Sequence, residues 1–197
     1  MPVHRIKLSP ELKAALSALP DREKDKLLFR LLAKEPPLVE RLTYELLESG
    51  DTEMERREEL AELILREAPK RIANYYSPGY LLLDLRAFSG AINRHVKTTR
   101  DKEGEIQLNL LMLNQLLPPL LHRIKAARRG KTVTLSKYVV QRARKLLRLI
   151  AKLHPDLHLE YTEGLRRLGD SIAAVPEMVH QAEAQGLDLA TLQRGEP

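Results

Sequence analysis

The 197-residue sequence contains no cysteine and no tryptophan, and it contains only two phenylalanines. Without cysteine the chain cannot form a disulfide framework, a thiolate metal site or a cysteine nucleophile. The scarcity of aromatic residues argues against a surface that stacks nucleic-acid bases or sugar rings. A compact chain of this length buries roughly 70% of the surface that its unfolded form exposes, so it can fold without a metal or a cross-link.

Long apolar runs are also absent. The first eight residues, M-P-V-H-R-I-K-L, contain no apolar segment of the kind found in secretory signals. Polar or charged residues interrupt every apolar run before it reaches eighteen residues. We therefore expect no secretory leader and no membrane-spanning helix, and the lack of cysteine favours a cytoplasmic location.

Strand patterns are scarce, and helix signals follow one another along the chain. Ser9-Pro10 and Ser77-Pro78 each place a capping serine before a proline that suits the first turn of a helix. Helices are predicted over residues 10–19, 21–35, 36–48, 51–67, 78–96, 106–117, 136–153 and 155–168. The predicted fold is all-α, either an irregular multi-helix bundle or a short α-solenoid-like array of eight or nine helices.

The stretch from 105 to 153 should organise the core. Eight of the twelve residues in I-Q-L-N-L-L-M-L-N-Q-L-L, at 106–117, are large and apolar, as in a helix buried on all sides. The helix at 136–153 instead has one apolar stripe opposite a basic face. In the predicted helix at 78–96, Gly90 predicts the close approach of another helix. We expect a single domain over 1–197, with core helices at about 78–168 and an acidic, partly flexible C-terminal tail at about 187–197.

Charge is distributed unevenly along the chain. Residues 106–155 include no Asp or Glu and eleven Lys or Arg, whereas residues 156–197 include eight acids and three Arg. Such asymmetry suggests either an acidic partner or an acidic segment that covers the basic one. A short turn at His154-Pro155 could bring the acids of the next helix to the basic face. The acids are Glu160, Glu163 and Asp170, and the bases are Arg144, Arg148 and Lys152.

The basic block supplies the candidate binding residues. They are Arg123, Lys125, Arg128, Arg129, Lys131, Lys137, Arg144, Lys145, Arg148 and Lys152. Such a run can be a solvated helix face, or it can bind an acidic protein or the phosphate backbone of a nucleic acid. The block has no interleaved aromatic residues for stacking on single strands, and no known DNA-reading motif places a helix in a groove.

The sequence contains only incomplete versions of catalytic or ligand-binding motifs. Gly130-Lys131-Thr132 lacks the earlier glycine of a phosphate-binding loop. His154 and His158 have the i, i+4 spacing of metal ligands, but Pro155 places His154 at a helix cap. Gln107 and Asn114 could line a polar pocket, although buried amides are usually satisfied by neighbouring backbone. No catalytic, metal-binding or cofactor-binding residue is predicted.

Three functions remain open at this stage. The favoured one is a non-enzymatic interaction or scaffold protein that binds an acidic protein or a partner helix through its helix faces. The alternative is a nucleic-acid-associated protein that uses the 123–152 face without sequence preference. The third is an enzyme or ligand carrier with a pocket between helices. The pattern leaves the oligomeric state open and predicts neither a cofactor nor membrane binding.

Overall fold

A computed structural model describes residues 6–196. Residues 1–5 and 197 lie outside the described residues. The predictions of a single domain over 1–197 and of no secretory leader therefore include residues that the structure does not describe. Over 6–196 the elements are α-helices and two short 3-10 segments, with no strand. The all-α prediction is confirmed. No helix in this range combines the length and the apolar character that a membrane crossing requires.

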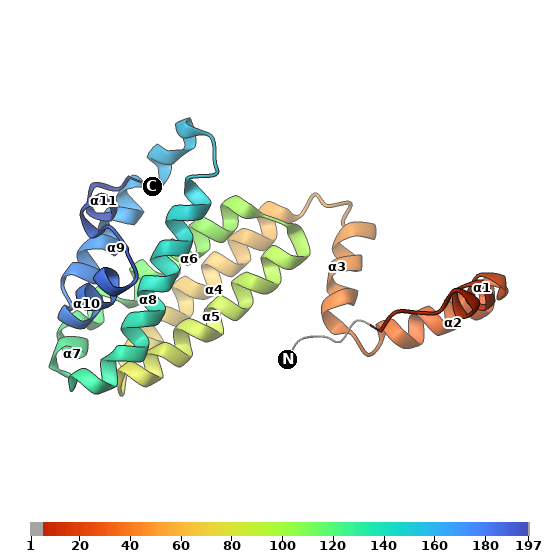
Figure 1. The fold of residues 1–197 in the computed structure, drawn as a ribbon, viewed down its shortest axis with the longest axis horizontal. Coiled ribbons are helices and arrows are strands. Elements are labelled where there is room, and N and C mark those ends of the chain that lie inside the picture. Colours follow the sequence, from red (N-terminus) through yellow and green to blue (C-terminus); the bar gives the residue numbers. More distant parts are fainter. Residues whose placement is uncertain (1–5, 197) are drawn as a thin grey trace.

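The chain begins with helices that extend away from the rest of the molecule. These are α1 (Pro10–Ala18) and α2 (Asp21–Leu32), followed by α3 (Pro36–Leu46). As predicted, Ser9 caps α1, since its side chain accepts a hydrogen bond from the Leu12 N–H at 3.2 Å. Helix α3 packs against the main body, whereas α1 and α2 project beyond it (Figure 1). We refer to residues 6–34 as the N-terminal arm and to residues 53–196 as the body.

The first layer of the body consists of α4 (Glu53–Ala73) and α5 (Pro78–Thr99), which pack against each other and against α6 (Lys102–Leu116). The predicted helix end at Glu67 is wrong, because α4 continues through Pro69. A proline removes one backbone donor. Ile64 and Ala68 on the same helix are fully buried, and we attribute the survival of α4 to this packing.

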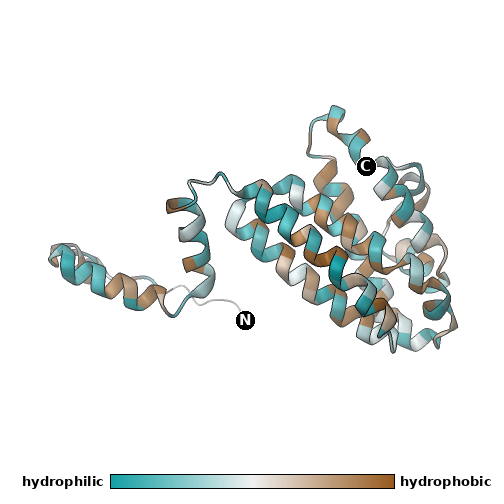
Figure 2. Ribbon diagram, turned by 180° about the vertical axis from the view of Figure 1, so that it is seen from behind, coloured by the Kyte–Doolittle hydropathy of each residue, from teal (hydrophilic) through white to brown (hydrophobic). Residues whose placement is uncertain are grey.

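Helix α6 lies at the centre of the body. It contacts α4, α5, α8 and α9, and Ile106, Met112 and Leu113 are completely buried. The prediction of a helix buried on nearly all sides is confirmed. Figure 2 shows hydrophobic and hydrophilic residues alternating in short bands along the helices of the body.

After α6, the 3-10 segment η1 (Pro118–Leu120) and the short α7 (Leu121–Ala126) lead into α8 (Arg129–Ile150). Helix α8 starts seven residues earlier than the predicted helix at 136–153, so the basic residues just before residue 136 are helical as well. The inward side of α8 carries the predicted stripe. Its buried members include Val139, Val140, Ala143, Leu146 and Ile150.

The C-terminal part contains η2 (Pro155–Tyr161), α9 (Thr162–Ala173), α10 (Pro176–Ala184) and α11 (Leu189–Arg194). The segment predicted as a partly flexible tail thus includes a helix that packs on the body. Leu192 of α11 is fully buried, and Gly169 of α9 leaves room for the backbone of Gln193. These short helices take the number beyond the eight or nine predicted.

Candidate functional site

One side of α8 carries a row of exposed cations. Lys137, Arg144 and Arg148 lie within about 40° of one another around the helix and extend over about 16 Å of it. All three are exposed, as is Lys152 just after the helix end. Among the described residues, no Asp or Glu forms an ion pair with any of the four. We call Lys137, Arg144, Arg148 and Lys152 the α8 basic stripe.

Three other members of the predicted basic set make contacts within the protein. Arg123 donates a hydrogen bond of 2.8 Å to the Tyr75 carbonyl, and its guanidinium lies 4.5 Å from the centre of the Tyr75 ring. Lys145 pairs with Glu105. Arg129 pairs with Glu177 at 2.7 Å, and this hydrogen bond and one from Gln181 lower the pKa of the Glu177 carboxyl. These three contacts connect α7 to the α4–α5 loop, α8 to α6, and α8 to α10.

The remaining members, Lys125, Arg128 and Lys131, are exposed around the junction of α7 and α8. Because Arg129 and Lys152 are about 35 Å apart along the helix, the ten predicted residues do not form one compact patch. The structure divides them into the α8 basic stripe, three internally bonded cations and three cations at the α7–α8 junction.

The predicted approach of the acidic segment to this stripe is wrong. Glu163 forms ion pairs with Arg166 and Arg167 of its own helix, and Asp170 accepts a hydrogen bond from Gln193. None of Glu160, Glu163 and Asp170 is paired with a stripe residue. The seven-residue η2 carries the chain away from α8, and α9 then returns mainly against α6 (Figure 1).

A hollow of about 450 Å³ lies beside Lys152, where α5 ends and α6 begins. Arg100, in a left-handed backbone conformation, joins these two helices. The hollow combines apolar side chains with exposed cations, and its one carboxylate, Glu105, is paired with Lys145. The apolar lining residues are Val96, Ile106, Leu149 and Leu153, and the exposed cations are Arg100, Lys102 and Lys152.

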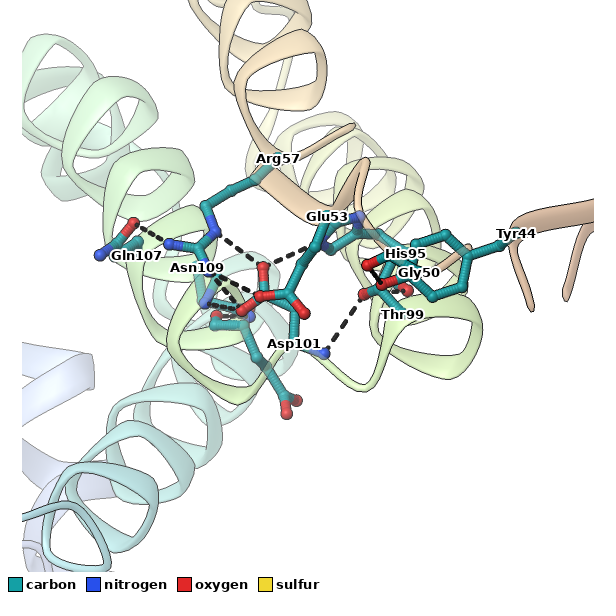
Figure 3. A network of polar contacts seen from close by, with 11 residues as sticks. Tyr44, Gly50, Glu53, Arg57, His95, Thr99, Asp101, Gln107 and Asn109 are labelled. Atoms are coloured by element: carbon teal, nitrogen blue, oxygen red, sulfur yellow. Dashed lines mark hydrogen bonds and ion pairs between the residues drawn. The ribbon is translucent and has the colours of Figure 1, made fainter. Parts of the chain in front are cut away.

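A separate polar network is buried between α4, α5 and α6 (Figure 3). Its centre is Asp101, which is only 3% exposed and caps the N-terminus of α6. Arg57 donates to both carboxylate oxygens, at 2.7 and 2.6 Å, and the Gly104 N–H donates at 2.7 Å. A ring nitrogen of His95 lies 3.0 Å from the carboxylate. Thr99 accepts a hydrogen bond from the backbone N–H of Asp101.

This environment stabilises the ionised form of Asp101. Burial by itself raises the pKa of the carboxyl, but the hydrogen bonds from His95, Arg57 and Gly104 outweigh it and lower the pKa to about 2. With four donors the carboxylate has its hydrogen-bonding capacity filled. The arrangement therefore holds three helices together and leaves no free oxygen for a substrate.

No pattern in the sequence predicts this network. Asp101 precedes Gly104 by three residues, a spacing compatible with a helix cap, but both residues fall between the predicted helices at 78–96 and 106–117. His95 lies among basic residues near the end of α5, a position typical of an exposed cation, but its side chain is buried. Arg57 and Asp101 are 44 residues apart, and no local pattern indicates that they pair.

The two amides considered for a pocket do border a hollow of about 380 Å³ between α6, η2 and α9. The Asn114 side-chain N–H₂ donates to the Gly164 carbonyl at 2.9 Å, so this amide links α6 to α9. The Gln107 carbonyl accepts a weak hydrogen bond of 3.4 Å from Arg57. The nearby acid Glu163 is paired with Arg167, which also lines the hollow.

The two histidines considered as metal ligands do not converge on one point. His154 caps η2 and lies 3.2 Å from Asp156, and a ring nitrogen of His158 lies 3.3 Å from the Leu153 carbonyl. Within residues 6–196, no group of three His, Asp or Glu side chains is placed to hold a metal ion.

The chain matches no protein-family model, no curated protein and no solved structure.

Proposed function

We propose that this chain is a non-enzymatic interaction protein that binds an acidic amphipathic helix of another protein. The observation that carries the proposal is the continuity of the uncovered α8 basic stripe with the hollow lined by Leu149 and Leu153. An apolar side chain of the partner enters the hollow, and its acidic residues lie against Arg100, Lys102 and the stripe. This combines an apolar anchor with electrostatic orientation.

Two features favour such a partner over a nucleic acid. Phosphate backbones require cations but make no use of an apolar hollow, whereas a helix groove is bound through apolar anchors one turn apart. The stripe also lies on a single helix face about 16 Å long from Lys137 to Arg148. It thus offers few simultaneous phosphate contacts. Non-specific nucleic-acid binding by residues 123–152 remains the alternative function.

The test is the binding of a fluorescein-labelled synthetic helix with leucines along one face and glutamates flanking them, measured by anisotropy at low salt. We expect saturable binding, and we expect the same peptide with lysine in place of glutamate not to bind. Charge reversal of Arg144, Arg148 and Lys152 to Glu should weaken binding at least tenfold, which corresponds to about 1.4 kcal/mol. Leu153→Asp should weaken it similarly by placing a carboxylate at the hollow.

A matched control reverses three exposed cations on other helices, Lys13, Arg86 and Arg166, and should leave the affinity unchanged. Circular dichroism confirms that each variant is folded. Duplex DNA is the competing probe. Binding of DNA that falls about a thousandfold between 50 and 200 mM salt, as expected for six phosphate contacts, together with no binding of the acidic peptide, would support the alternative and reject our proposal.

A further inference from the structure

The N-terminal arm exposes apolar side chains on both of its helices. Neither α1 nor α2 contains a buried residue. Phe29 and Leu31 are 64% and 61% exposed, and Leu28 is 49% exposed. On α1 the exposed residues Leu12 and Leu16 lie one turn apart on the same side. Figure 2 shows these hydrophobic segments on a part of the chain that no second layer of helices covers.

The arm is too small to be stable with its apolar residues in water. Isolated helices shorter than about 12–15 residues are marginal even with favourable sequences, and α1 and α2 have 9 and 12 residues. A helix in a globular protein gains most of its stability by burying an apolar face. The two short helices of the arm therefore need a covering surface from outside the arm.

The charges of the arm restrict what that surface is. Residues 21–26 of α2 read D-R-E-K-D-K, in which acidic and basic residues alternate strictly. Over α1 and α2 there are four acids and five bases, so these two helices together carry a net charge of only +1, with Lys7 and Lys34 flanking them at the ends of the arm. A membrane-surface helix has a polar face rich in Lys and Arg, and a nucleic-acid surface is basic. The arm instead fits a surface that is apolar in the middle and carries both signs of charge around it, as the arm itself does.

We propose that the covering surface is the arm of a second copy of this chain. Two such arms related by a two-fold axis contribute four short helices, enough to enclose their leucines in a four-helix arrangement. A two-fold contact is self-complementary and closes at a dimer. The arm projects beyond the body in Figure 1, which leaves space for a second molecule there. This inference goes beyond the proposed binding function and does not depend on it.

The first test is the mass of the full chain in solution by sedimentation equilibrium. The expected result is a reversible dimer of about 45 kDa, twice the chain mass of 22.5 kDa. The Leu28→Asp/Leu31→Asp double variant should be a monomer with unchanged helix content, because it places charges in the paired faces. A matched control, Leu65→Asp/Leu83→Asp, alters two exposed leucines of the body and should remain a dimer.

The second test locates the contact. Because the chain has no cysteine, a single Ser17→Cys substitution places one spin label on the arm of each copy. Dipolar coupling between the two labels is expected in the dimer. Three results overturn the proposal: a wild-type monomer at high concentration, a dimer that shows no coupling, or a dimer lost in the body control. A chain that stays monomeric and sediments with phosphatidylserine–phosphatidylcholine vesicles would show that the arm binds membranes instead.

Discussion

Gly104 occupies a position where no other residue fits. A Cβ atom built on it would lie 1.9 Å from the Asp101 carboxylate and 2.8 Å from the Arg57 guanidinium. Its backbone N–H also donates to the same carboxylate. The absence of a side chain therefore allows Asp101 to cap α6 and to receive Arg57 at once.

We expect Gly104→Ala to lower the free energy of unfolding by about 2–4 kcal/mol. The methyl group displaces a carboxylate that two helices share, and breaking such a buried pair costs more than the gain of about 1 kcal/mol in helix propensity. Urea denaturation measures the change.

Gly90→Ala is the matched control for this substitution. The nearest atom to a Cβ at Gly90 is a guanidinium nitrogen of Arg94 at 3.8 Å, an ordinary contact. The prediction that another helix approaches closely at Gly90 is therefore wrong, and alanine there should raise stability by up to about 1 kcal/mol. Equal decreases in the free energy of unfolding for the two variants would show that the lack of space around Gly104 does not cause the destabilisation.

At the scale of helices, the sequence predicts which segments are helical better than it predicts where each helix ends. The Ser-Pro pairs at 9–10 and 77–78 mark the starts of α1 and α5, because a proline suits the first turn and a serine caps it. The all-round apolar pattern of 106–117 identifies the buried α6. The continuation of α4 through Pro69 could not be predicted, because the gain that offsets the missing donor comes from packing of side chains distant in sequence.

The C-terminal helices show the same limit. The acidic composition of residues 187–197 predicts a partly flexible tail, but α11 is placed by its packing on α9, which the local pattern does not reveal. The basic face could be predicted from composition. Its separation into a free stripe and internally bonded cations such as Arg129 and Lys145 could not, because the partners Glu177 and Glu105 lie 40 or more residues away.

We expect Leu192→Ala in α11 to destabilise the protein by about 2–5 kcal/mol, the usual cost of removing a buried leucine side chain. Leu187→Ala should also be destabilising, since this residue belongs to the same core. The exposed Leu159 of η2 is the control, and its replacement by alanine should change stability by less than about 0.5 kcal/mol. Chemical denaturation that found no loss at Leu192 would indicate that α11 is not part of the folded core.

For the whole molecule, the Asp101 network makes stability depend on pH. The pKa of this carboxyl is about 2 in the folded protein, compared with the ordinary aspartate value of 3.8 that we take for the unfolded chain. Because the pKa is lower in the folded protein, the ionised carboxyl stabilises the fold at pH values above the pKa of the unfolded chain. This stabilisation is lost as the pH falls from about 4 to about 2. At 1.36 kcal/mol per pKa unit the contribution is roughly 2 kcal/mol.

Asp101→Asn should therefore be less stable than the wild type by roughly 3 kcal/mol at neutral pH, because it leaves the buried Arg57 without its counter-charge. The difference between the two proteins should shrink as pH falls from about 4 to about 2. Urea denaturation across this range measures it, with Glu163→Gln, from an exposed ion pair, as the control that should follow the wild type. A constant difference at every pH would contradict the role assigned to Asp101.

The burial of α6 on nearly all sides also matters while the chain is being made. Its partners α4 and α5 precede it, but Leu110 lies against Gly164 of α9, and α8 also follows α6 in the chain. Helix α9 ends 57 residues after α6. At about 5–20 residues per second, the ribosome needs roughly 3–11 s to complete that cover. During this interval the nascent chain presents an apolar helix to the surrounding solution, so a pause in translation here would make it a substrate for chaperones.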